Sequence, residues 1–302
     1  MKLIISLLAC AVFAYAGIVA DVRASLQKNN FPEAEALISR YRAEKGVTPE
    51  MIAAYSWLGR AALAAKNFDQ AEKYAGTTKK LAVEQLKKAK LESNPNADLP
   101  IALGAAIEVH GQSLAARGQR AEATEYLQQE LAAYRNTAIR TRIQKNLNLV
   151  SLEGKPAPAL EMKTFLGPKA PPLSALKGKP VLLFFWAHWC GDCKREVEIV
   201  AQLRRQYAAK GLVVIGPTQH YGYAEAGRDV GPEEELAYIE KIRKQFYGSL
   251  LDMPAPVSEE NFRNYGASTT PTLVLIDRKG IVNLFHPGNL SLDELQARID
   301  RL

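Results

Sequence analysis

A pair of cysteines separated by two residues follows an apolar run and is the most chemically specific feature of the sequence. The run at residues 181–187 leads through His188 and Trp189 to Cys190 and Cys193, and a charged, helix-favouring segment begins at once. We therefore predict a strand that delivers a dithiol to a helix N-terminus. Free backbone N–H groups and the helix dipole favour a thiolate there.

The two cysteines are expected to have different roles in thiol-disulfide exchange. Cys190 is nearer the free N–H groups of the predicted helix, so we expect it to be the more readily ionised thiol, whereas Cys193 is shielded inside the first turn. A second cysteine at this spacing can resolve a mixed disulfide that the first one forms. Zinc would need a second Cys-x-x-Cys or a His-x3-His, and the sequence has neither. We predict no metal and no cofactor other than the redox-active disulfide.

The third cysteine, Cys10, lies in an N-terminal segment with the features of an export signal. Residues 1–16 contain a basic residue, an apolar run and an Ala-x-Ala site, which predict a cleaved signal peptide and a periplasmic protein. Cys10 also ends a sequence similar to a lipoprotein cleavage box, so lipid anchoring through Cys10 is an alternative. A buried N-terminal helix is a second alternative.

Length and charge leave room for two ordinary globular domains. The chain has 302 residues, and its net charge of +7 comes from 39 basic and 32 acidic residues without a long block of one sign. Nucleic-acid binding requires a basic stripe that this sequence does not contain, so we predict no nucleic-acid partner.

Residues 17–150 show helical spacing of apolar residues and a degenerate internal repeat. Gly59 stands twelve residues before Ala71, Gly111 stands twelve before Ala123, and a tyrosine follows each alanine by three residues. This pattern resembles the tetratricopeptide repeat, in which small residues let paired helices pack closely. We predict a helical domain with a concave surface for a protein partner; the alternative is an irregular helical bundle.

Residues 151–302 are different in kind and predict an α/β domain. A stiff, exposed segment at 154–158 marks the boundary, and a short hairpin is expected within 160–166. Buried strands alternate with helices and end in a hairpin, which indicates a mixed central sheet with helices on both faces. The expected strands are 181–186, 212–216, 272–277 and 281–285, and the expected helices are 191–209, 232–246, 259–265 and 291–302.

The motifs of this domain resemble those of the exported, TlpA-like thiol-disulfide oxidoreductases of the thioredoxin superfamily. The resemblance covers residues 154–302 and rests on three features, which are the Trp-Cys-Gly-Asp-Cys at 189–193, Glu196, and the Thr-Pro-Thr at 270–272. It implies a thioredoxin fold, an exposed nucleophile at Cys190, a resolving thiol at Cys193, and a cis-proline at Pro271 that faces them. Glu196 is implied to tune proton transfer; the alternative is a solvated helix residue.

Other residues near the cysteines are candidates for substrate contact. We assign Trp189, Thr270 and His188 to substrate binding. We interpret His188 as a surface residue that shapes access, with thiolate stabilisation as the alternative. The loop at 217–231 is either a substrate-recognition lip or a mobile surface loop. Asp192 stands where the family often has proline, and its charge disfavours a thiolate on Cys190, so we expect a more reducing dithiol.

Together these features predict an enzyme, a thiol-disulfide oxidoreductase that reduces disulfides of exported proteins. An upstream donor, which the sequence does not identify, would supply the electrons. One alternative is a helical-repeat scaffold with an accessory thioredoxin domain. A second is a thiol peroxidase, whose site resembles Thr-x-x-Cys, whereas Ala187 stands three residues before Cys190 here.

Overall fold

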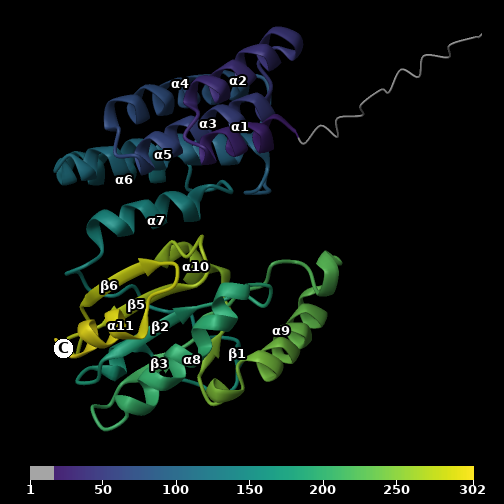
Figure 1. Ribbon diagram of the computed structural model, residues 1–302. Helices are drawn as coiled ribbons and strands as arrows, with labels where there is room; N and C mark the ends of the chain where they lie inside the picture. Colours follow the sequence, from purple (N-terminus) through teal and green to yellow (C-terminus); the bar gives the residue numbers. More distant parts are fainter. Residues whose placement is uncertain (1–16) are drawn as a thin grey trace, which may run out of the picture. The chain divides into compact units, whose positions relative to one another are not determined.

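The structure is a computed structural model that describes residues 17–302 (Figure 1). The predicted signal segment and Cys10 therefore lie outside the described residues. The chain divides into two compact units, the first comprising residues up to 92 with 96–109, and the second comprising 93–95 with 110–302. The predicted division between residues 150 and 151 stays a prediction.

The first unit is helical, and the caps of its helices are local. Asn30, Thr48 and Asn67 each accept a backbone hydrogen bond at a helix N-terminus. The helices are α1 (Ile18–Gln27), α2 (Phe31–Lys45), α3 (Pro49–Ala64), α4 (Phe68–Leu86) and the first part of α5 (Asp98–Ala116).

The repeated glycines lie where helices approach closely. A Cβ built on Gly59 of α3 would lie 3.5 Å from Tyr74 Cβ of α4. In the second unit, a Cβ on Gly111 of α5 would lie 3.0 Å from the Leu127 side chain of α6 (Arg120–Ala133). The approach of successive helices is therefore tight at Gly111, whereas a Cβ at Gly59 would make an ordinary van der Waals contact.

The second unit contains a four-stranded sheet with strand order β3-β2-β5-β6. Strand β2 pairs in parallel with β3 and antiparallel with β5, and β5 pairs antiparallel with β6. The sheet strands are β2 (Val181–Phe185), β3 (Val213–Ile215), β5 (Thr272–Ile276) and β6 (Val282–Pro287). The helices that follow α6 are α7 (Arg140–Ser151), α8 (Gly191–Gln206), α9 (Pro232–Phe246), α10 (Glu259–Tyr265) and α11 (Leu292–Ile299), with short 3-10 turns η1 (Leu173–Leu176), η2 (Glu225–Gly227) and η3 (Gly248–Leu250).

Both faces of the sheet are covered, as the uninterrupted apolar strand predicted. Leu182 and Phe184 of β2 pack in a cluster with residues of α8, α9 and α11. Leu183 and Phe185 face the other way and pack with residues of α10. The alternation of side chains along a strand thus divides one apolar run between two cores.

One expectation about residues 154–166 differs from the structure. The hairpin predicted within 160–166 is wrong, because β1 (Phe165–Leu166) pairs antiparallel with β4 (Ala255–Pro256), far along the chain. The exposed segment at 154–158 also joins the sheet edge: Gly154 N donates to Val282 O at 2.8 Å, and Val282 N donates to Lys155 O at 2.9 Å.

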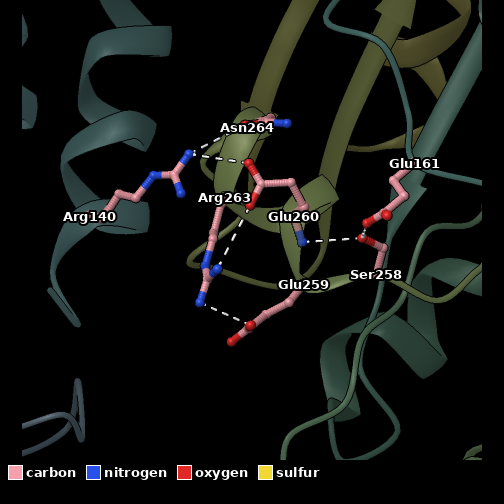
Figure 2. A network of polar contacts seen from close by, with 7 residues as sticks. All are labelled: Arg140, Glu161, Ser258, Glu259, Glu260, Arg263 and Asn264. Atoms are coloured by element: carbon pink, nitrogen blue, oxygen red, sulfur yellow. Dashed lines mark hydrogen bonds and ion pairs between the residues drawn. The ribbon is translucent and has the colours of Figure 1, made fainter. Parts of the chain in front are cut away.

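Helix α7 is joined to α10 by polar and close-packed contacts (Figure 2). Arg140 donates to Glu260 at 3.3 Å and to Asn264 at 3.4 Å, and Figure 2 shows these beside the ion pairs that Arg263 makes within α10. Gly266 follows α10 with φ of 63°, and a Cβ there would lie 2.3 Å from Lys145 N of α7. These contacts place α7 in the same unit as the sheet. Helix propensity depends on local sequence and does not predict contacts between helices that are distant in the chain.

Candidate active site

The dithiol lies where the sequence placed it, between the end of β2 and the start of α8. Cys190 is the N-cap of α8 and forms a disulfide with Cys193. Cys193 N donates to Cys190 Sγ at 3.0 Å, so a backbone N–H of the first turn is directed at this sulfur. The same N–H can stabilise a thiolate on Cys190 after reduction. Cys190 is only 3% exposed, which is less than the resemblance implied, and Cys193 is fully buried.

The start of β5 brings a second segment to the dithiol. Because β5 runs antiparallel beside β2, Thr272 pairs with Phe185 at the end of β2. The peptide bond between Thr270 and Pro271 is cis, and Cys190 Sγ lies 3.3 Å from the Thr270 carbonyl oxygen. Residues eighty positions apart in the sequence therefore form one surface around the nucleophilic sulfur.

Glu196 is a buried acid one turn into α8. Its side chain is 1% exposed, so the alternative of a solvated helix residue is wrong. Asn289 Nδ2 donates to Glu196 Oε2 at 2.6 Å, and Leu290 N donates to Oε1 at 3.3 Å. Burial raises the pKa of Glu196, while the Asn289 bond opposes this shift. Asn289, which the sequence did not mark, therefore adjusts the protonation of this acid.

His188 is buried, so its interpretation as a surface residue is wrong. It is 2% exposed, and aromatic side chains of the loop at 217–231 and of helix α9 lie against it. Its ring lies edge-on to three tyrosines, with centroid distances of 5.5, 5.3 and 5.4 Å to Tyr221, Tyr223 and Tyr238. Burial is the main reason that the pKa of His188 is lowered, which weakens the alternative of a protonated histidine beside the thiolate.

Glu235 faces His188 and is a second buried carboxylate that the sequence did not single out. Its side chain is 1% exposed, and His188 Nε2 lies 3.5 Å from Glu235 Oε1. A usable pattern was present in the sequence, because Glu235 shares the inward face of α9 with the buried Ile239 and Ile242. A charged residue on an apolar helical stripe indicates a buried polar partner.

Known proteins match the part of the chain that carries this site. The AhpC/TSA family matches residues 154–285. Thioredoxin-like protein YneN of Bacillus subtilis is 30% identical over 148 residues, which are 49% of this chain and 79% of YneN. The chain belongs to the TlpA/ResA-like thiol-disulfide oxidoreductases of the thioredoxin superfamily.

Further relatives agree with this assignment. Thiol-disulfide oxidoreductase ResA of Bacillus thuringiensis is 27% identical over 151 residues, covering 49% of this chain and 78% of ResA. Thiol:disulfide interchange protein DsbE of Yersinia pestis is 29% identical over 143 residues, covering 47% and 67%. The predicted thioredoxin fold is confirmed, and so is the predicted activity: this TlpA/ResA-like protein is a thiol-disulfide oxidoreductase with a Cys190–Cys193 redox pair. The scaffold and peroxidase alternatives have less support.

The exposed side chains of this TlpA/ResA-like site include an indole and a charged pair. Trp189 is 49% exposed and lies edge-on to Tyr221, with ring centroids 5.4 Å apart. Asp192 is also exposed and pairs with Arg195, one turn along α8. This partner offsets part of the charge that we expected to act on Cys190, and solvent screens the remainder.

Two structural observations bear on cofactors and on location. Within residues 17–302, no group of three or more His, Cys, Asp and Glu side chains is arranged to hold a metal ion. In the same residues, no helix has both the length and the apolar character needed to cross a membrane.

Proposed function

We propose that this oxidoreductase reduces disulfides in other proteins outside the cytoplasm, with Cys190 as the attacking thiol and Cys193 as the resolving thiol. The observation that carries the proposal is the position of Cys190. Its sulfur caps α8, accepts a backbone hydrogen bond from Cys193 N, and lies 3.3 Å from the Thr270 carbonyl oxygen. The names of ResA and DsbE, an oxidoreductase and an interchange protein, support the same chemistry.

The reaction proceeds through one mixed disulfide. The Cys190 thiolate attacks a substrate sulfur, a Cys190–substrate bond forms, and the other substrate sulfur leaves as a thiolate. Cys193 then loses its proton and attacks Cys190 Sγ, and the second substrate thiolate leaves. Two electrons pass to the substrate, and a dithiol donor must reduce the Cys190–Cys193 disulfide again. No other cofactor takes part.

Glu196 is proposed to accept the proton of Cys193. The support is its burial at the base of the same helical turn and its raised pKa, which brings a carboxyl closer to working pH. Thr270, which precedes Pro271, is proposed to present backbone to an extended substrate by strand addition, because proline has no N–H and its carbonyl oxygen already accepts from Gly288 N at 2.8 Å. Trp189 adds an exposed apolar contact. His188 is assigned a supporting position instead of direct substrate contact.

The decisive experiment is insulin reduction by the purified protein with dithiothreitol as the donor. The wild type should reduce insulin, and Cys190→Ser should be inactive. In a separate incubation without dithiothreitol, Cys193→Ser should accumulate a mixed disulfide with insulin that mass spectrometry detects and that added dithiothreitol releases. Failure of the wild type to reduce insulin, or trapping by Cys190→Ser instead of Cys193→Ser, would refute the assignment.

The export of the protein and its division into domains are also proposals. Residues 1–16 are proposed to be a signal peptide that directs the protein to the periplasm, with lipid anchoring at Cys10 as the alternative. The intact mass of the mature protein separates them, because cleavage after residue 16 gives an unmodified chain and lipidation gives a heavier one that begins at Cys10.

Residues 17–150 are proposed to form a tetratricopeptide-like domain that binds a protein partner, and residues 151–302 a thioredoxin domain. The close approaches at Gly59 and Gly111 support the helical pairing. A partner-binding domain predicts that substitutions on its exposed faces change which proteins Cys193→Ser traps. An irregular bundle predicts an unchanged set.

A further inference from the structure

One buried charge in the unit is not used by the dithiol reaction. Glu235, in the first turn of α9, receives two backbone hydrogen bonds from the loop at 217–231. Tyr221 N donates to Oε1 at 2.5 Å, and Gly222 N donates to Oε2 at 3.0 Å. Each carboxylate oxygen is therefore occupied by a main-chain donor from the same two-residue stretch.

Two imidazoles complete the surroundings of this carboxylate. His188 Nε2 lies 3.5 Å from Oε1, and His220 Nδ1 lies 3.2 Å from Oε2. The backbone N–H groups can only donate, so both oxygens of Glu235 must accept. An ionised carboxylate meets this requirement, whereas a glutamine would direct its NH2 group at a backbone N–H.

The loop that Glu235 holds also contacts the segment that leads into the dithiol. Trp186 N donates to Pro217 O at 3.1 Å, and Thr218 Oγ1 donates to Trp186 O at 3.0 Å. Farther along the loop, Tyr221 lies edge-on to the exposed Trp189, which directly precedes Cys190. A continuous set of contacts therefore runs from Glu235 through Tyr221 to the indole beside the nucleophile.

We propose that Glu235 is a positioning residue that fixes Tyr221, and thereby the Trp189 indole, so that the site favours polypeptide disulfides over small ones. This inference rests on the proposed reduction of protein disulfides. A polypeptide must bind the surface around Cys190, and an ordered aromatic surface lowers the entropic cost of that binding. A small disulfide needs little more than the sulfur itself and gains little from the ordered loop.

The test compares Glu235→Gln with Glu233→Gln, which removes the same charge from an exposed position in the same turn. Hydrogen-deuterium exchange at the Tyr221 and Gly222 amides should accelerate about tenfold or more in Glu235→Gln, since hydrogen bonds to a charged acceptor are lost. The KM for insulin should rise about fivefold to tenfold, with kcat nearly constant. In the variant the loop is no longer ordered in advance, so insulin binding must bear the entropic cost of ordering it. Turnover of hydroxyethyl disulfide should stay within about twofold. Glu233→Gln should match the wild type in all three measurements.

A second variant covers the case in which Glu235→Gln does not fold. Tyr221→Leu retains the carboxylate and its backbone donors but removes the ring that contacts Trp189, and it should raise the insulin KM in the same way. The proposal is wrong if either folded variant has the wild-type insulin KM, or if both substrates lose turnover equally. An inactive wild type with insulin would overturn the proposed function instead, while the exchange rates would still report whether Glu235 holds the loop.

Discussion

The region around Glu196 and the region around Glu235 contain the same kind of side chain, buried to the same 1% exposure, in opposite chemical settings. Glu196 receives a side-chain amide at 2.6 Å and one longer backbone bond of 3.3 Å. Glu235 receives two backbone N–H groups and has an imidazole near each oxygen. Burial therefore does not by itself tell whether a carboxyl will exchange protons or act as a fixed anchor.

The difference lies in what the surroundings donate. Burial raises the pKa of Glu196 because its hydrogen bonds only partly replace water. Glu235 is held by two main-chain donors of the loop at 217–231, whereas one of the two donors on Glu196 is the side-chain amide of Asn289. We infer that the first region exchanges protons and the second maintains geometry. The following substitutions test this contrast.

Glu196→Gln should have the largest effect on rate. We expect insulin turnover at pH 7 to fall about 100-fold, which is typical for loss of a general acid-base group. The wild-type rate should rise with pH through the raised pKa of Glu196, and this limb should be absent from the variant. A pH-rate profile for both proteins measures it, and a limb that persists in Glu196→Gln would assign the proton to another group.

The same substitution should not lower stability. The folded protein keeps the Glu196 proton to higher pH than the unfolded chain does, so ionisation costs stability as pH rises above the ordinary value of 4.5. Glutamine stays neutral, and its NH2 group can be accepted if the Asn289 amide turns its oxygen toward it while Leu290 N keeps its bond, so the urea midpoint at pH 7 should be retained.

Glu235→Gln should have the opposite effect on stability. We expect the free energy of unfolding to fall by about 2 kcal/mol, because buried backbone donors lose their charged acceptor. Urea unfolding at pH 7, with Glu233→Gln as the control, measures the change. Equal midpoints for Glu235→Gln and Glu196→Gln would remove the contrast between the two regions.

Asn289→Ala should move the proton on Glu196 without removing the carboxyl. The Asn289 amide lowers the pKa of Glu196, so its loss should shift the rising limb of the pH-rate profile to higher pH. We expect insulin turnover at pH 7 to fall about threefold to tenfold, and turnover above the shifted limb to recover. Loss that is equal at every pH would indicate that Asn289 has only a structural role.

His188→Gln should change how stability depends on acid. His188 is near Glu235 and the Lys194 charge, and burial lowers its pKa from the ordinary value of 6.5. The unfolded chain then binds this proton at higher pH than the folded protein, so His188 makes stability fall as pH drops below about 6.5. The free energy of unfolding, measured with urea at pH values from 7.5 to 5, should decline less in the variant than in the wild type. The difference should be up to about 1 kcal/mol. Parallel curves would show that His188 does not titrate in this range.

Asp192→Pro should have the smallest effect, because this carboxylate is exposed and paired with Arg195. The wild type should still be the more reducing protein, but we expect a difference of less than about 20 mV, which corresponds to under about 1 kcal/mol. Titration in glutathione buffers measures it. A higher potential for the wild type would contradict the expected sign, and a much larger difference would show that exposure does not screen this charge.

Patterns in short segments of the sequence were sufficient for much of the fold. The apolar run before Cys190 predicted β2, and a proline followed by three glutamates predicted the start of α9 at residue 232. The capped start of α11 is present too, where Ser291 and Glu294 form a capping box. Such features depend on residues within a turn or two of one another, so local rules describe them well.

The partners of the candidate site were less predictable. Glu196 was identified by its place after Cys193, but its proton affinity depends on Asn289, ninety-three residues farther along. The burial of His188 was not predicted, because the tyrosines around its ring come from the loop at 217–231 and from α9. The strand pairing of β1 with β4 was missed because the two strands lie far apart in the sequence.

The sequence by itself determined the chemistry, because two cysteines at this spacing between a strand and a helix have few other uses. It also determined the local elements that present them. Only the tertiary structure decided that one buried glutamate is held by a side-chain amide and one long backbone bond, and the other by two backbone donors with an imidazole near each oxygen. Burial and hydrogen bonding are produced by distant segments that fold against each other, and no short stretch of sequence contains both sides of such a contact.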